Sequence, residues 1–171
     1  KNIPFDEKGK WASSGKTSSI LLSLLMEDPY LAKPPPKSTG REHYNLEWLT
    51  KHLHSQDIAP EDVQATLLDF TATTIISAVT KWGSSCENII VCGGGRLNTA
   101  LLQRIKELSS FTISVAEDHD VDGDSIESSA FAWLAHQTLS KKAGSQIAVT
   151  GAKGPRILGA IHPGLASNFP I

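Results

Sequence analysis

The segment from residue 88 to residue 115 constrains the fold more than any other part of the sequence. Residues 88–92 form a short apolar run rich in branched side chains, which is typical of a buried strand. Residues 93–95 are all glycine, and leucine and isoleucine then recur at helical spacing up to Leu108. Residues 111–115 alternate as a second strand. This order predicts two parallel strands joined by a right-handed crossover helix.

Helical patterns flank this unit on both sides. An apolar stripe at helical spacing begins at Pro60 and ends at Gly83, which predicts a long core helix. Asn45 is placed to cap a short amphipathic helix over residues 46–53, and residues 17–19 offer caps for another helix that Pro29 ends. Residues 124–139 predict a further helix, and residues 147–161 predict two short extended pieces around a turn at 151–155.

Two strands alone make a poor parallel sheet, because such sheets are normally buried and need neighbours at their edges. We therefore expect an α/β fold of parallel strands flanked by helices that is incomplete without strands from upstream in a longer chain. The opening at Lys1, which runs directly into Pro4 and Phe5, also indicates a fragment.

The composition excludes several classes of function. A net charge of −2 over 171 residues provides no basic surface for nucleic acid. Cys86 and Cys92 are too few for a disulfide framework or a zinc site. No apolar run approaches the roughly 18 residues of a membrane span, and the first ten residues lack a signal-peptide core. We expect a soluble cytoplasmic protein with neither nucleic acid nor membrane as a partner.

Two motifs with familiar functions have ordinary explanations. Residues 9–17 resemble a phosphate loop, but five residues separate the two glycines where the motif needs four, and no strand precedes them. Asp120, Asp122 and Asp124 alternate as in a calcium loop, but Ser125 stands where the motif needs glycine. The six histidines show no convincing ligand pair.

Two local features leave structural and functional interpretations open. Glu127 lies three residues after Asp124, so the pair fits a capping box at a helix start as well as a ligand-binding acid. The glycines that follow Cys92 fit an ordinary strand-to-helix turn, but they would also let the backbone approach a flat or anionic ligand.

Collinear blocks along most of the chain resemble the anhydro-N-acetylmuramic acid kinases, a family of sugar kinases in the actin-like ATPase superfamily. The matching blocks are Pro4-Phe5-Asp6 with Gly9, Trp11, Ala12 and Gly15, then Asp28-Pro29-Tyr30, residues 37–42 with Asn45, residues 62–67, residues 92–95, residues 122–124 with 127–135, and residues 149–152. The order and approximate spacing of so many blocks are more specific than any single one.

The resemblance implies that residues 1–171 are the carboxy-terminal nucleotide-binding lobe of a two-lobed kinase with a ribonuclease H-like fold. It implies ATP and Mg²⁺ as cofactors, with Gly93, Gly94, Gly95 and Asn98 on the adenosine side and Glu127 facing the sugar. The implied reaction opens the 1,6-anhydro ring of the substrate with water and phosphorylates its 6-hydroxyl. The family's general base and phosphate-binding segments are expected upstream of Lys1, so no catalytic residue is assigned in this chain.

The implied partners are the sugar substrate, the missing amino-terminal lobe and a possible second copy in a homodimer. No metal ligand is assigned. The alternative to the kinase is a non-catalytic nucleotide-binding or interaction domain built on the same lobe.

Overall fold

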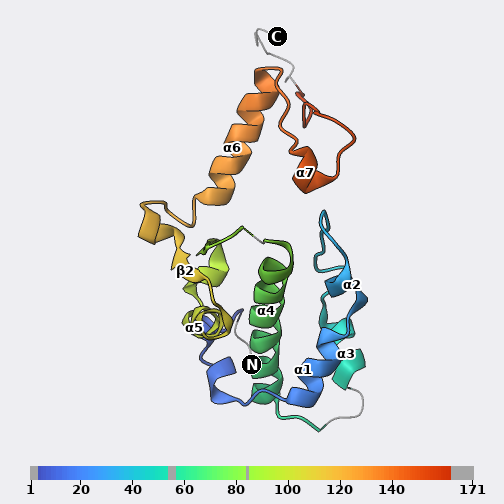
Figure 1. Cartoon of the computed structure of the whole chain (residues 1–171), viewed down its shortest axis with the longest axis vertical. Coiled ribbons are helices and arrows are strands. Elements are labelled where there is room, and N and C mark those ends of the chain that lie inside the picture. Colours follow the sequence, from blue (N-terminus) through green and yellow to red (C-terminus); the bar gives the residue numbers. More distant parts are fainter. Residues whose placement is uncertain (1–3, 54–56, 84, 163–171) are drawn as a thin grey trace. The chain divides into compact units, whose positions relative to one another are not determined.

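A computed structural model describes residues 4–53, 57–83 and 85–162 of the chain (Figure 1). His54, one of the histidines considered above, lies outside these residues. The chain divides into two compact units, with the boundary between Ile126 and Glu127.

The first unit contains short 3₁₀ helices, α-helices and a pair of strands. Its elements in chain order are η1 (Glu7–Gly9), η2 (Ala12–Ser14), α1 (Ser19–Met26), α2 (Pro29–Ala32), α3 (Leu46–Leu53), α4 (Pro60–Trp82), β1 (Asn88–Val91), η3 (Gly94–Leu97), α5 (Thr99–Leu108), β2 (Thr112–Val115) and η4 (Ala116–His119). The predicted alternation of helix, strand, helix and strand is confirmed, with boundaries shifted by one or two residues.

Strands β1 and β2 pair in parallel, with Asn88 opposite Thr112 and Val91 opposite Val115. The predicted crossover and the predicted α/β class are therefore confirmed. The prediction that β1 is a buried strand is wrong for this chain, since the side chain of Ile90 is 52% exposed. On one face of the described sheet, Ile89 and Ile113 pack against α4 and α5, whereas the neighbouring residue Ile90 is exposed.

Helix α4 carries the core of the first unit on two of its sides (Figure 1). On one side Phe70 packs against Leu21 and Leu25 of α1, and on the other Ala72 and Ile76 pack against Ile105 of α5. The predicted long core helix from Pro60 to the Gly83 stop is thus confirmed. Burial of apolar side chains in these two clusters is the main favourable contribution to folding.

Helix α4 also meets the length and composition of a membrane-crossing helix, contrary to the expectation that no apolar run is long enough. The core helix of a soluble protein passes the same test. Because α4 packs against α1, α5 and η2, this finding is weak evidence for a membrane span.

Side-chain caps define the helix starts as the sequence predicts. The Ser18 hydroxyl accepts from the Leu21 amide at 3.3 Å at the start of α1, and Asn45 Oδ1 accepts from the Trp48 amide at 2.9 Å at the start of α3. Pro29 follows the end of α1, as predicted, but it also opens the short helix α2, where Asp28 accepts from the Tyr30 amide at 2.8 Å.

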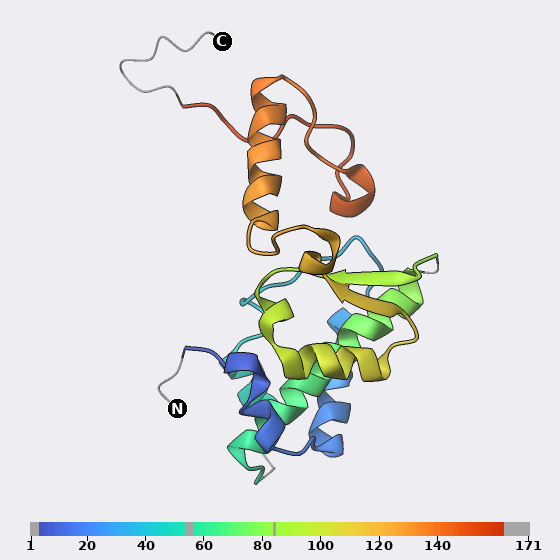
Figure 2. The same cartoon turned by 90° about the vertical axis from the view of Figure 1, so that its left-hand side faces the viewer.

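The second unit contains α6 (Ile126–Leu139), whose first residue ends the first unit, and the short helix α7 (Ile147–Thr150). The expected apolar side of α6 is only partly covered: no described residue of this helix is buried, Trp133 is 50% exposed, and Ile126 and Leu134 are half-buried. Figure 2 shows the segment after α6 folding back beside this helix, where the Thr138 hydroxyl donates to the Leu158 carbonyl.

The prediction of an extended piece at residue 147 is wrong. Residues 147–150 form a helical turn that Gly151 ends at a φ of 70°, with its amide donating to the Ile147 carbonyl at 3.0 Å. The β-branched side chains here favour a strand, but no described strand pairs with this segment. A helical turn pairs its backbone groups locally instead.

Candidate functional site

The glycine turn, defined as residues 93–98, connects β1 to α5. Gly93 has a φ of 70° and a ψ of −177°, a backbone conformation that essentially only glycine adopts. Residues Gly94–Leu97 then form η3, and Asn98 caps α5 through its Oδ1, which accepts from the Leu101 amide at 3.0 Å. The four residues predicted to hold the cofactor are thus brought together at the carboxyl end of a parallel strand.

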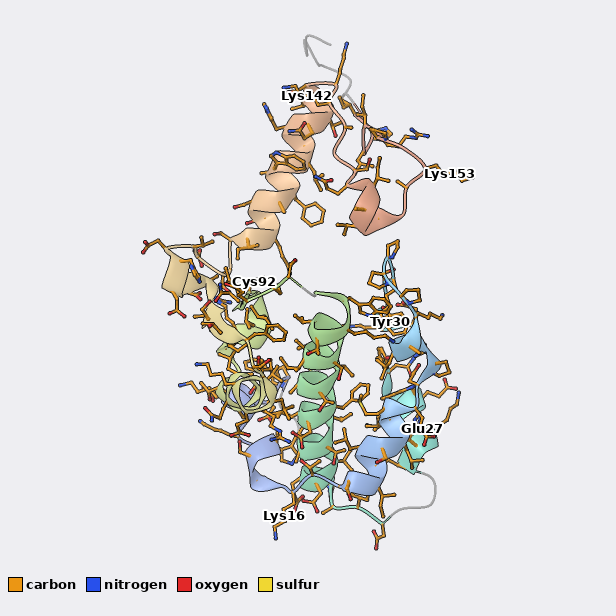
Figure 3. The ribbon with its side chains drawn as sticks, viewed as in Figure 1. Lys16, Glu27, Tyr30, Cys92, Lys142 and Lys153 are labelled. Atoms are coloured by element: carbon orange, nitrogen blue, oxygen red, sulfur yellow. The ribbon has the colours of Figure 1, made fainter. Side chains whose placement is uncertain are left out.

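The tip of the turn is open. A β-carbon added at Gly94 or at Gly95 would meet no atom within 4 Å, and both residues are exposed. Cys92, labelled in Figure 3, is the residue before the turn and is also exposed. Packing inside the first unit therefore requires glycine at position 93 for its φ, but not at positions 94 and 95.

The beginning of the chain packs against the end of the turn. A β-carbon at Gly9, whose φ is 72°, would lie 2.4 Å from Asn98 Oδ1 and 2.5 Å from the β-carbon of Ala100. The Thr99 hydroxyl donates to the Lys8 carbonyl at 3.2 Å. Two of the sequence blocks that are distant along the chain, those around Gly9 and Gly95, are therefore neighbours in the fold.

The phosphate-loop look-alike at residues 9–17 has structural partners. The Lys16 amide donates to Asp62 Oδ1 at 2.7 Å, and the Thr17 hydroxyl donates to Asp69 Oδ2 at 2.5 Å. The segment consists of 3₁₀ turns and a loop rather than a strand that leads into a helix. In the described residues the segment therefore lacks the strand-to-helix geometry of a phosphate loop, as the sequence predicts.

Arg96 lies within the turn, and the sequence assigned it no role. Its side chain is 5% exposed, its Nε donates to Glu117 Oε1 at 2.6 Å, and its Nη1 donates to Asp124 Oδ1 at 2.8 Å. Nη1 also donates to the Gly93 carbonyl at 3.1 Å. Hydrogen bonds from Arg96 lower the pKa of both carboxyl groups, and those bonds raise the pKa of Arg96 in turn.

The predicted capping role of Asp124 needs correction, because its carboxylate accepts from Arg96 and α6 begins two residues later. Glu127, the residue predicted to face the sugar, lies in the first turn of α6 with an exposed side chain. It belongs to the second unit, whereas the glycine turn belongs to the first. An acidic residue in a first helical turn is also stabilised by the helix dipole, so the role of Glu127 stays a prediction.

Three cations beside glycine-containing turns, Lys37, Arg41 and Lys153, have local partners or stand in solvent. Lys37 Nζ donates to the carbonyls of Tyr30 and Leu31, both at 3.1 Å, while Arg41 and Lys153 are exposed. Figure 3 labels Tyr30 and Lys153. In residues 4–53, 57–83 and 85–162, no group of three or more histidine, cysteine or acidic side chains is placed to hold a metal ion.

Residues 1–164 match the model of one protein family, described as anhydro-N-acetylmuramic acid kinase. The chain belongs to the anhydro-N-acetylmuramic acid kinase family. The resemblance inferred from the sequence blocks is thereby confirmed, and with it the fold class of the actin-like ATPase type.

Proteins named anhydro-N-acetylmuramic acid kinase align along nearly the whole chain. The one from Variovorax paradoxus is 46% identical over 162 residues, which cover 94% of this chain and 43% of that protein. Those from Xylella fastidiosa and Coxiella burnetii are 43% and 41% identical over 93% and 98% of this chain, and over 42% and 45% of their own lengths. The chain therefore spans less than half the length of the curated relatives that it matches.

Proposed function

We propose that this chain is the carboxy-terminal, nucleotide-binding lobe of a cytoplasmic ATP-dependent kinase that opens the 1,6-anhydro ring of anhydro-N-acetylmuramic acid and phosphorylates its 6-hydroxyl in cell-wall recycling. The observation that carries the proposal is the open glycine turn at the end of β1, in a chain of this family. A backbone without side chains at the carboxyl end of a parallel strand suits a nucleotide, which such folds bind at this edge.

Each residue of the turn has a distinct task in this proposal. Gly93 sets the direction in which the chain leaves β1, and Gly94 and Gly95 leave clearance for the adenosine. Asn98 caps α5, so that the helix starts directly behind the ligand. Because a β-carbon at Gly94 or Gly95 would meet no atom within 4 Å, a flat ring could approach the backbone there without a clash.

Glu127 is proposed to accept hydrogen bonds from sugar hydroxyl or acetamido groups, a task that its exposed carboxylate suits. Mg²⁺, when bound with ATP, would neutralise phosphate charge. The described part of the chain offers no acidic cluster for it, so we expect its ligands on the ATP phosphates and on the amino-terminal lobe. The same lobe should supply the general base, and this chain alone should therefore be inactive. A homodimer of the whole kinase is part of the proposal.

The test uses a full-length protein that contains this chain, with ATP, Mg²⁺ and the anhydro sugar. We expect ADP formation that depends on the sugar, and a product with the mass of N-acetylmuramate 6-phosphate. Nucleotide binding without sugar-dependent turnover would refute the kinase and indicate a nucleotide sensor. Absence of nucleotide binding in calorimetry would indicate an interaction domain in which the turn serves packing only.

A further inference from the structure

Arg96 is a buried cation at the carboxyl end of β1. Among residues 4–53, 57–83 and 85–162, it is the one buried lysine or arginine. Burying a charge is costly unless the charge is paired and hydrogen-bonded. The three acceptors of Arg96 meet this requirement, and they come from different parts of the chain.

The three acceptors connect the glycine turn to the segment that follows β2. Glu117 belongs to η4, Asp124 lies just before α6, and the third acceptor is the carbonyl of Gly93 at the entry of the turn. Arg96 therefore links residues 93, 117 and 124 through one planar side chain. The rigid fork of an arginine can hold such an arrangement, whereas a lysine ammonium is a compact charge whose three donors have no fixed planar geometry.

Gly123 provides the space that Arg96 occupies. A β-carbon at Gly123 would lie 2.2 Å from Arg96 Nε and 2.7 Å from both Cδ and Cζ. The Gly123 amide also donates to Glu117 Oε1 at 3.3 Å, the same oxygen that accepts from Arg96. An alanine at this position would force the guanidinium to move, although residue 123 is far along the chain from the turn.

We propose that Arg96 is a positioning residue for the nucleotide, because it holds the glycine turn in the shape that accepts the adenosine. Gly123 has no side chain and so leaves room for the Arg96 guanidinium. The proposal rests on the proposed function of the turn. A run of glycines has more conformational freedom than any other backbone, and a site that is ordered before binding avoids that cost when the ligand arrives. Arg96 needs no contact with the nucleotide for this task.

The experiment compares Arg96→Met, Arg96→Lys and Gly123→Ala in a full-length protein that contains this chain. Arg104→Met is the matched control, because Arg104 also binds two carboxylates, those of Asp69 and Glu107. Neither of these hydrogen bonds reaches the glycine turn. The measurements are the Kd for ADP by calorimetry, KM for ATP and for the sugar, and amide hydrogen exchange over residues 93–98.

For Arg96→Met and Gly123→Ala we expect nucleotide affinity to fall about tenfold or more, with KM for the sugar unchanged within about twofold. Amide exchange at residues 93–98 should accelerate in both. Arg96→Lys should keep more ADP affinity than Arg96→Met but less than the wild type, since a lysine ammonium lacks the planar fork that meets the three acceptors. Arg104→Met should lower thermal stability and leave the Kd for ADP unchanged. If Arg96→Met fails to fold, the milder Arg96→Lys and Gly123→Ala variants are compared with the wild type and with Arg104→Met instead.

Unchanged ADP affinity and unchanged exchange in Gly123→Ala and Arg96→Lys would overturn the positioning role. Equal loss of ADP affinity in Arg104→Met would also overturn it, because the effect would then follow general stability. Failure of the wild-type protein to bind ADP would refute the proposed function instead. Amide exchange distinguishes the two failures, because it reports on the turn without any ligand.

Discussion

Alanine substitutions at three successive glycines should separate the structural demand of the turn from its functional demand. Gly93 has a φ of 70° and a ψ of −177°, so Gly93→Ala should destabilise the protein by about 1–3 kcal/mol. Gly94 and Gly95 lie in η3 with no positive φ and with open space around them. Alanine there removes backbone freedom from the unfolded chain and should stabilise the protein by about 0.4–1 kcal/mol.

Nucleotide affinity should follow a different order. A methyl group at Gly94 or Gly95 would stand where the adenosine approaches, so we expect the affinity to fall about tenfold or more, which corresponds to about 1.4 kcal/mol. The two variants would thus be more stable and less functional than the wild type. The assays are denaturant unfolding and calorimetry with ADP, both on a full-length protein that contains this chain.

Two results would refute this reasoning. If Gly94→Ala and Gly95→Ala keep the wild-type affinity for ADP, no ligand comes close to the turn. If either variant loses more stability than Gly93→Ala, the tip of the turn is packed rather than open.

Four further outcomes follow from the packing of the first unit. Ile105 is 1% exposed between α4 and the sheet, so Ile105→Ala should lower the free energy of unfolding by about 2–5 kcal/mol in a denaturant titration. Asn98→Ala should lower the free energy of unfolding by about 1 kcal/mol through loss of the α5 cap. Asn98→Asp should keep most of this stability in the same titration. Gly15→Ala would bring a β-carbon within 2.1 Å of the Glu61 carbonyl oxygen. This clash should lower the free energy of unfolding by about 1–3 kcal/mol, measured by thermal unfolding. Burial raises the pKa of Asp28, but hydrogen bonds from His43, Tyr30 and Trp48 outweigh burial and lower the pKa below the ordinary value of 3.8. Ionised Asp28 should therefore stabilise the protein above pH 3.8, and this contribution should be lost as the pH falls through the lower pKa of the folded state. In a plot of unfolding free energy against pH, Asp28→Asn should make the decrease at acid pH less steep.

The positions of most helices and strands could be predicted because their signals are local. Serine, asparagine and proline set the starts of α1, α3 and α4, and Gly83 ends α4. The strand, glycine and helix order also predicted parallel pairing, because a crossover of this length leaves few other topologies. The same local chemistry placed Gly93, Gly94, Gly95 and Asn98 in one turn.

Burial and distant pairing could not be predicted in the same way. Ile90 has the composition of a buried residue, yet it is exposed because the described sheet has only two strands. The short helix α7 replaced a predicted extended piece, since a strand needs a partner and a helical turn does not.

The sequence by itself determined where the elements lie, which residues make the glycine turn and which family the chain resembles, since caps, periodicity and motif order are properties of neighbouring residues. Only the tertiary structure decided that Arg96 binds Glu117 and Asp124, which follow it by 21 and 28 residues, and that Gly123 makes room for it. Charged side chains in loops carry no signal of their partners until the chain has folded, because such contacts depend on how distant segments pack and not on local preference.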